Sequence, residues 1–235
     1  MTKEEEFMVS RYTQHLLSKS TSYPAEGLIR IFKGKYPHLP TIPSHGRLLD
    51  AGCGDARNSI FLQQLGFEVH AFEIDLDVIV KLENEFPQIK FSVGTNNRTK
   101  YDNDFFELIV SWQALYYLGE DESVTIEDNI SELHRILNPN GLLITCIPFS
   151  SNFIYRDSEI MNTNLDISYR RINDYFKQRT GARLACFETK EAYGELLNKF
   201  GFTDHVFSEF KGDWFGLNYD WFVCISRKAS PALNP

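Results

Sequence analysis

The 235-residue sequence contains little of what membrane proteins, metal sites and disulfide-linked folds require. No apolar run is long enough to cross a bilayer, and the first ten residues, MTKEEEFMVS, hold no apolar signal core. The four cysteines show no CxxC spacing and the six histidines no HxxxH spacing, so we expect no metal site and no disulfide. These absences favour a cytoplasmic protein with reduced thiols.

Positive charge is also scarce. The chain has 24 Lys and Arg against 32 Asp and Glu, which gives a formal net charge of -8. Such a balance argues against a surface built to hold DNA, RNA or anionic lipid. We therefore expect a small-molecule partner and neither nucleic acid nor membrane, while the sequence makes no prediction of the oligomeric state.

From residue 47 onward, short apolar runs alternate with segments whose apolar residues recur every three or four positions. This alternation predicts βα units and a mostly parallel sheet, that is, an α/β fold. The last two strands have only WFGLN and its neighbours between them, so we expect them to pair antiparallel. The predicted strands cover residues 47–51, 68–72, 90–93, 106–111, 142–148, 205–210 and 221–226.

A glycine loop, RLLDAGCGDARNS, follows the first predicted strand at residues 47–59. In open α/β sheets such a loop passes beneath the ligand, and Gly52 and Gly54 would let the backbone approach it closely. The dinucleotide pattern G-x-G-x-x-G is incomplete because a third glycine is missing. A pyrophosphate would also be repelled by Asp55, whereas a ligand with cationic groups would be favoured. S-adenosylmethionine, which carries a sulfonium and an ammonium, is such a ligand.

The second predicted strand ends in an acidic residue, Glu73, within the stretch VHAFEID. At this place in the fold a carboxylate can accept hydrogen bonds from both hydroxyls of a ribose. Standing alone, Glu73 would be a solvated carboxylate at a strand end. Together with the glycine loop it indicates a nucleoside site, and Asp75 is expected to be the N-cap of the following helix.

Five motifs in this order resemble the class I, seven-stranded, Rossmann-like family of S-adenosylmethionine-dependent methyltransferases. The resemblance covers residues 47–148 and extends through 187–202. It implies a doubly wound, mostly parallel seven-stranded sheet with an antiparallel terminal strand, an N-terminal helical extension and an insertion after the fifth strand. The matching residues are Asp50 to Ala56, Glu73, Gly94-Thr95-Asn96, FELIVS at 106–111 and RILNPNG at 135–141.

The resemblance further implies a binding site for S-adenosylmethionine at the carboxyl ends of the strands. Gly52 and Gly54 would lie under the methionyl part, and Asp50 would orient the loop or the amino group. Arg30 would meet the methionyl carboxylate or, alternatively, would be an exposed helix residue. The full expected set is Asp50, Gly52, Gly54, Glu73, Ile74, Thr95, Asn96, Ser111, Trp112, Gln113 and Arg30.

Four residues depart from the family pattern without contradicting it. Thr95 and Asn96 stand where the family often has an aspartate that contacts the adenine amino group, so adenine recognition would rest on the Asn96 amide or on the backbone. Ala56 stands where the third family glycine usually is, a change that a helix start tolerates. Asn140 replaces a glycine before the fifth strand, and asparagine tolerates the left-handed conformation better than other side chains do.

The resemblance implies one domain with four parts. A helix is expected at residues 21–32 and a proline-rich linker at 36–46, while Thr189 and Gly201 would cap the last helix. The parts are an N-terminal helical cap and linker (1–46), the cofactor-binding half (47–148), an insertion that caps the substrate (149–188), and the C-terminal helix and strands (189–235).

Methyl transfer is an in-line displacement, so a general base is needed only where the acceptor must lose a proton. Candidate catalytic residues are Tyr116, Tyr117 and Tyr155, whereas His134 is expected to be structural. The (D/N)-P-P-(Y/F) motif of the family's nucleobase and glutamine enzymes is absent after the fourth strand, where the chain has SWQA. We therefore expect transfer to oxygen or nitrogen of a small molecule, with a softer acceptor atom left open.

Two other functions fit the same motifs. A non-catalytic protein would keep the S-adenosylmethionine pocket but transfer no methyl group. An NAD-dependent oxidoreductase would share the glycine loop and the acidic residue after the second strand, although the missing glycine and Asp55 argue against it.

Overall fold

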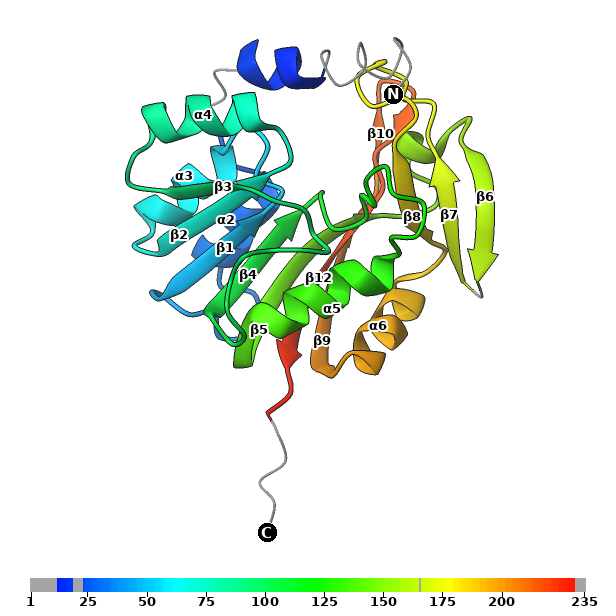
Figure 1. Cartoon of the computed structure of the whole chain (residues 1–235). Coiled ribbons are helices and arrows are strands. Elements are labelled where there is room, and N and C mark those ends of the chain that lie inside the picture. Colours follow the sequence, from blue (N-terminus) through cyan, green and yellow to red (C-terminus); the bar gives the residue numbers. More distant parts are fainter. Residues whose placement is uncertain (1–11, 19–22, 165, 231–235) are drawn as a thin grey trace.

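The computed structural model describes residues 12–18, 23–164 and 166–230, and its centre is a seven-stranded sheet (Figure 1). The strand order is β3-β2-β1-β4-β5-β12-β9. Strands β1 to β5 pair in parallel, and β12 runs antiparallel to both β5 and β9. This confirms the predicted sheet. The strands are β1 (Arg47–Ala51), β2 (Glu68–Glu73), β3 (Lys90–Val93), β4 (Phe106–Trp112), β5 (Leu137–Pro148), β9 (Phe202–Phe210) and β12 (Trp221–Lys228).

Helices cover both faces of this sheet, because its central strands are apolar on both sides. The stretches LLDA in β1 and LIVSW in β4 are buried at every position, as expected for parallel strands between helical layers. In Figure 1, α5 lies in front of the sheet and α2 and α3 lie behind it. The helices are α2 (Glu26–Lys33), α3 (Arg57–Gln64), α4 (Leu76–Glu85), α5 (Ile126–Ile136) and α6 (Lys190–Lys199).

The helix ends follow the capping residues that the sequence offers. Asp75 accepts hydrogen bonds from the amides of Asp77 and Val78, and Thr189 accepts one from the amide of Ala192. Both N-cap predictions are therefore confirmed. Gly201 follows α6 with a φ of +81°, and Asn140 adopts the left-handed φ of 65° expected of it. These residues set where each helix meets the sheet.

The start of β5 differs from the prediction. The strand is predicted to begin at residue 142, but α5 ends at Ile136 and the chain enters β5 at Leu137 without an intervening loop. The extra residues are accommodated by an irregular register between β4 and β5, at Phe106 and Leu108. Proline and asparagine at the beginning of a strand are compatible with such an irregularity.

The insertion after β5 contains structure that the hydrophobic pattern did not predict. A short helical turn, η1 (Phe153–Tyr155), precedes a three-stranded antiparallel sheet with the order β6-β7-β8. All six residues of β6 are exposed, so its sequence EIMNTN shows no alternation of apolar and polar residues. The strands are β6 (Glu159–Asn164), β7 (Ile167–Arg171) and β8 (Arg183–Phe187), and a further hairpin joins β10 (Asp213–Trp214) to β11 (Leu217–Asn218).

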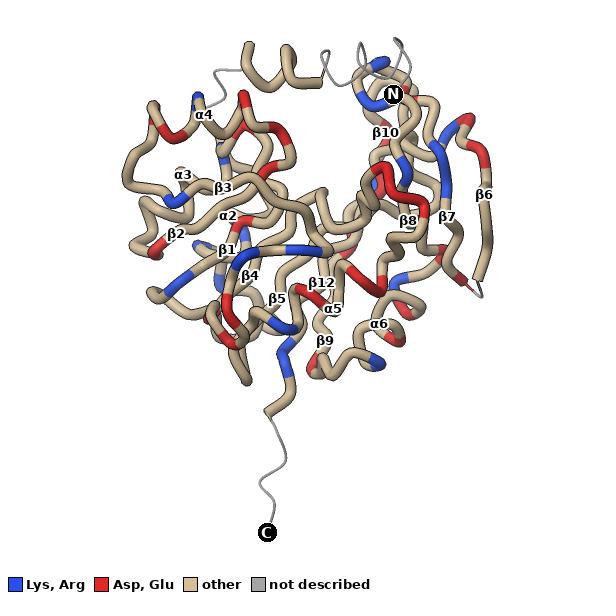
Figure 2. Tube along the Cα trace, in the orientation of Figure 1, with Lys and Arg blue, Asp and Glu red and all other residues tan. Residues whose placement is uncertain are grey.

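The N-terminal part contributes two helical segments. Residues 12–18 are helical, and α2 begins after Pro24; positions 21–22 of the predicted helix lie outside the described residues. The linker at 36–46 has neither helix nor strand, as predicted. None of the described helices is both long and apolar enough to cross a bilayer. Figure 2 shows acidic and basic residues interspersed around the described fold rather than segregated by sign.

Candidate functional site

The loop between β1 and α3 is held against β2 by two backbone hydrogen bonds. The amides of Gly52 and Cys53 both donate to the carbonyl of Phe72, at 3.1 and 2.9 Å. Gly52 has a φ of +74°, and a Cβ added to it would lie 2.5 Å from the Cβ of Ala114. Glycine is therefore required at this position for its backbone conformation and also for the close approach of the chain after β4.

Ala56 occupies the place of the missing third glycine and also has a left-handed backbone, with a φ of 60°. A residue with a Cβ in this conformation costs on the order of 1 kcal/mol. The helix nevertheless begins directly after it, at Arg57. The departure from the family pattern is tolerated at the cost of local strain.

Glu73 joins the end of β2 to the glycine loop. Its side chain is 6% exposed, and its two carboxylate oxygens accept hydrogen bonds from the amides of Gly54 (3.0 Å) and Ile74 (2.9 Å). Burial raises the pKa of this carboxyl group. A buried carboxylate in this position retains lone pairs for the hydroxyls of a ribose. The exposed side chain of Ile74 offers an adjoining apolar surface.

Asn96, in the loop after β3, presents a buried acceptor atom. Its amide nitrogen donates to the carbonyl of Ala114 at 3.0 Å, which orients the side chain. In the described part of the chain its Oδ1 is buried without a hydrogen-bond partner. An adenine amino group is a donor of the kind that this atom lacks. Thr95 is half-buried next to it, and its carbonyl accepts the amide of Arg98.

Three carboxylates gather around the glycine loop, and we call Asp50, Asp55 and Glu73 the acidic cluster. Burial raises the pKa of Asp50 to about 6; the charges of Glu73 and Asp55 add to this rise, and a 2.6 Å hydrogen bond from Ser59 opposes it. Arg57 borders the cluster, with its Nε 4.0 Å from Oδ1 of Asp55. Such a cluster favours a cationic ligand. Among the described residues no group of three or more His, Cys, Asp or Glu is arranged to hold a metal ion.

The residues after β4 divide into two kinds. Ser111 is buried and donates to the carbonyl of Ala51 at 3.4 Å, and Trp112 packs against α2, where a Cβ on Gly27 would lie 2.3 Å from its ring. These two residues hold the sheet and α2 together. Gln113 has a left-handed φ of 60°, an unusual conformation for its type that is often found at functional sites. It precedes Ala114, the residue that contacts both Gly52 and Asn96.

Arg30 lies apart from these groups. It is on the exposed surface of α2, where its guanidinium binds the carboxylate of Glu26 at 2.6 Å and the hydroxyl of Tyr36 at 3.2 Å. This position corresponds to the surface alternative given above. The pairing with Glu26 one helical turn away is a common surface interaction.

The helical segment at residues 12–18 belongs to the part of the chain that is predicted to form an N-terminal helical cap, and it lies over the glycine loop, although no helix was predicted for these residues themselves. Leu16 is 6% exposed, and its methyl group would lie 3.8 Å from a Cβ on Gly54. The hydroxyl of Thr13 donates to Asp75, and Lys81 donates to the carbonyl of Leu17 at 2.9 Å, so the segment is attached to α4. Figure 1 shows this segment across the top of the fold, beside α4. A bound cofactor would lie beneath it.

The three candidate tyrosines differ in their surroundings. The hydroxyl of Tyr155 donates to the carbonyl of Ala185 at 2.7 Å, and that of Tyr117 accepts a 2.7 Å hydrogen bond from Arg179. Tyr116 is fully buried, and burial raises the pKa of all three side chains. None of them is therefore prepared to take a proton at neutral pH. His134 packs edge-on against Phe202, away from these tyrosines.

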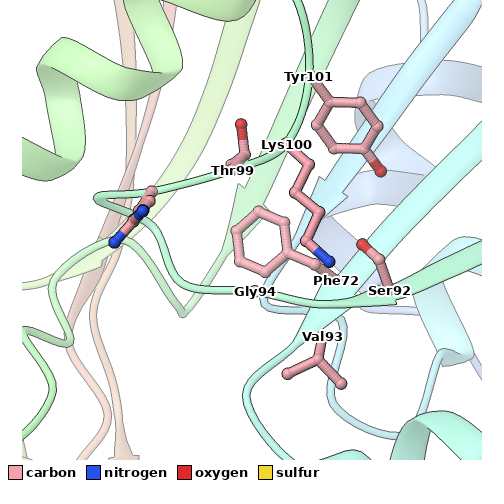
Figure 3. A pocket seen from close by; sticks show the side chains of 8 residues that line it. Phe72, Ser92, Val93, Gly94, Thr99, Lys100 and Tyr101 are labelled. Carbon is pink, nitrogen blue, oxygen red and sulfur yellow. The ribbon is translucent and has the colours of Figure 1, made fainter.

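A separate hollow of about 330 Å³ lies beneath the loop that connects β3 to β4. In the view of Figure 3 the side chain of Lys100 lies between the ring of Phe72 and the side chain of Ser92. None of the residues expected to bind the cofactor lines it. The hollow includes Gly94, which directly precedes Thr95 and Asn96 in the loop after β3. Its lining residues are Phe72, Ser92, Val93, Gly94, Arg98, Thr99, Lys100 and Tyr101.

Comparison with known proteins identifies the class of this fold. Residues 22–205 match the family model described as a methyltransferase domain, and the chain belongs to that family. A methyltransferase structure from Methanosarcina mazei, described as S-adenosylmethionine-dependent, superposes with a TM-score of 0.65 and 19% identity over 84% of this chain and 99% of its own. The resemblance found in the motifs is thereby confirmed, and so is the Rossmann-like methyltransferase fold.

Two named enzymes extend the comparison. The 1,6-didemethyltoxoflavin-N1-methyltransferase of Burkholderia thailandensis, with S-adenosylhomocysteine bound, has a TM-score of 0.61 and 16% identity over 98% of this chain and 92% of its own. The malonyl-[acyl-carrier protein] O-methyltransferase of Salmonella typhimurium is 25% identical over 134 residues, 57% of this chain and 47% of that enzyme. The chain spans about half the length of the curated relatives it matches: 54% of the methyltransferase YqeM of Bacillus subtilis and 47% of the Salmonella enzyme.

Proposed function

We propose that this protein binds S-adenosylmethionine at the glycine loop and transfers its methyl group to an oxygen or nitrogen of a small molecule. The observation that carries the proposal is the acidic cluster of Asp50, Asp55 and Glu73 around two left-handed glycines. A cationic nucleoside satisfies this cluster, whereas a pyrophosphate would be repelled by it. The N-methyltransferase named above, which holds 1,6-didemethyltoxoflavin, supports a small-molecule acceptor, and the O-methyltransferase supports oxygen as an acceptor atom.

In this proposal each part of the site has a binding role. Glu73 would hold the ribose hydroxyls, and the buried Oδ1 of Asn96 would accept the adenine amino group. Gly52 and Gly54 would lie under the methionyl part, next to the buried Asp50. S-adenosylmethionine, when bound, supplies a methyl carbon that is already activated by its sulfonium.

The chain's remaining contribution is positioning and exclusion of water. The helical segment at residues 12–18 would close over the cofactor, with Leu16 facing the glycine loop. Tyr116 and Tyr117 lie after the carboxyl end of β4, where an acceptor would approach. In-line transfer needs the acceptor atom and the methyl carbon to be held in alignment, and it needs no metal.

The transfer itself is tested with a radiolabelled donor. The purified protein is incubated with methyl-labelled S-adenosylmethionine and a cell extract that has been separated into small molecules and macromolecules. The proposal expects label in one product of the small-molecule fraction. Label only in nucleic acid or protein would contradict it, and binding of the donor without any labelled product would favour the non-catalytic alternative.

The pH dependence of cofactor binding tests the role of Asp50. Below about pH 6 this buried carboxyl takes up a proton, so the acidic cluster loses a negative charge and attracts a cationic ligand less. We expect the affinity for S-adenosylmethionine to fall by up to about tenfold between pH 7 and pH 5. Calorimetry at several pH values measures this, and Asp50→Asn should flatten the profile; an unchanged profile in the variant would contradict the role.

The same carboxyl should have the opposite effect on the stability of the free protein. Its pKa rises from 3.8 to about 6 on folding, so between these values the folded state binds more protons than the unfolded state. Stability contributed by Asp50 is therefore lost as the pH rises through this window. Urea unfolding of the wild type and of Asp50→Asn should show a smaller loss in the variant.

A further inference from the structure

Three buried hydrogen-bond donors lie among and beside the candidate tyrosines. They are Nε of Arg179, the hydroxyl of Tyr116 and Nε1 of Trp221, and we call them the donor cluster. Each of these atoms is buried and has no hydrogen-bond partner among the described residues. Buried donors without a partner cost free energy, so a cluster of them suggests a ligand that supplies acceptors.

Direct contacts connect the members of the donor cluster. Arg179 donates to the hydroxyl of Tyr117 at 2.7 Å, and the ring centroids of Tyr117 and Tyr116 lie 4.9 Å apart. The ring centroids of Trp221 and Tyr116 are separated by 6.3 Å. The three donors thus belong to one continuous group of side chains. Tyr116 and Tyr117 follow β4, and Trp221 opens β12 opposite Pro148, the last residue of β5.

The guanidinium of Arg179 forms no salt bridge with a carboxylate in the described part of the chain; Asp174 acts on it through its charge, and its side-chain hydrogen bond goes to Tyr117. The carboxylate nearest along its own loop belongs to Asp174, which is buried and whose oxygens accept the backbone amides of Phe176, Gln178 and Arg179. Through these hydrogen bonds Asp174 holds the backbone of its own loop, residues 174–179, in place. They also fix the backbone of Arg179, so the guanidinium is held in place and remains available to an anion.

Tyr12 relates the donor cluster to the glycine loop. It lies on the helical segment at residues 12–18 and is within electrostatic range of Glu73 as well as of Tyr117 and Arg179. A molecule held by Arg179 would therefore lie beside the cofactor pocket. This is the position required of a methyl acceptor.

We infer that the methyl acceptor carries a carboxylate group, and that Arg179 binds this group with help from Tyr116 and Trp221. The inference rests on the proposed function and names its substrate class. One guanidinium and two neutral donors match the single charge and two oxygens of a carboxylate. A phosphate dianion would need a second cation, and the donor cluster contains Arg179 alone. The rings of Tyr116, Tyr117 and Trp221 offer an apolar surface for the body of the acid.

The test measures anion preference in the protein saturated with S-adenosylhomocysteine. Sodium benzoate and benzamide have the same shape but differ in charge, and each is titrated at constant ionic strength by ligand-observed NMR. The wild type is expected to bind benzoate about tenfold more tightly than benzamide. Arg179→Met should abolish this preference, whereas Arg156→Met, which removes an exposed arginine, should retain it. Trp221→Phe keeps an aromatic ring but lacks the indole donor, and should weaken benzoate binding by about threefold.

The outcomes separate the inference from the proposed function. Equal binding of benzoate and benzamide by the wild type, or a preference that survives in Arg179→Met, would overturn the carboxylate site. So would loss of S-adenosylhomocysteine binding in Arg179→Met with its thermal midpoint unchanged, because the guanidinium would then serve the cofactor. Failure of the wild type to bind S-adenosylhomocysteine at all would instead overturn the proposed function.

Discussion

Replacing Glu73 by alanine is expected to weaken the binding of S-adenosylmethionine by at least about 100-fold. The change removes the proposed acceptor of both ribose hydroxyls, and hydrogen bonds to a charged group contribute about 1.5–3 kcal/mol each. It also releases the amides of Gly54 and Ile74, so the glycine loop loses the group that holds it to β2. Isothermal titration calorimetry of the variant and the wild type measures the difference.

A second glutamate on the same strand provides the control. Glu68 lies at the other end of β2, where it is exposed and forms a salt bridge with Lys90. Glu68→Ala removes the same side chain and should leave the affinity for S-adenosylmethionine unchanged. Equal losses in the two variants would mean that the effect comes from the strand or from net charge, and would contradict the role of Glu73.

Replacing Gly52 by alanine is expected to destabilise the protein by roughly 2–5 kcal/mol and to abolish cofactor binding. About 1–2 kcal/mol comes from placing a Cβ in a left-handed conformation. Roughly 1–3 kcal/mol more comes from overpacking, since the new Cβ would lie 2.5 Å from that of Ala114. Urea unfolding measures the stability, and calorimetry measures the binding.

Gly119→Ala is the matched control for this substitution. Gly119 has a φ of +71°, close to that of Gly52, but nothing lies within 4 Å of a Cβ added there. The control should therefore lose only about 1–2 kcal/mol of stability and keep its affinity for S-adenosylmethionine. If both variants lost the same stability, the close approach of Ala114 to the glycine loop would not matter.

The central strands of the sheet were predictable from the sequence because they are buried on both faces. Short apolar runs, such as LL in RLLDA and LIV in FELIVS, mark these strands, and β1 was predicted to the residue. The strands of the insertion were not predicted, because β6 lacks the apolar residues that mark a buried strand. β6 is exposed throughout, and its pairing with β7 depends on backbone hydrogen bonds that leave no hydrophobic pattern.

The candidate site was predictable where function requires a particular residue in a local motif. Gly52, Glu73 and the helix caps belong to this kind. Two other features could not be predicted in this way: the position of Leu16 over the glycine loop and the position of the Arg179 guanidinium beside Tyr117. Each of these side chains contacts residues far away in the chain. Long-range contacts of single side chains leave no periodic signal, so only the fold reveals them.

The glycine loop is expected to bind a cationic nucleoside rather than a pyrophosphate. Calorimetric titration of the wild type with S-adenosylmethionine, S-adenosylhomocysteine and NADH distinguishes these ligands. Both sulfur-containing nucleosides should bind with one site per chain and micromolar affinity, and NADH should not bind. Heat with NADH, or none with either S-adenosyl compound, would show that this assignment of the loop is wrong.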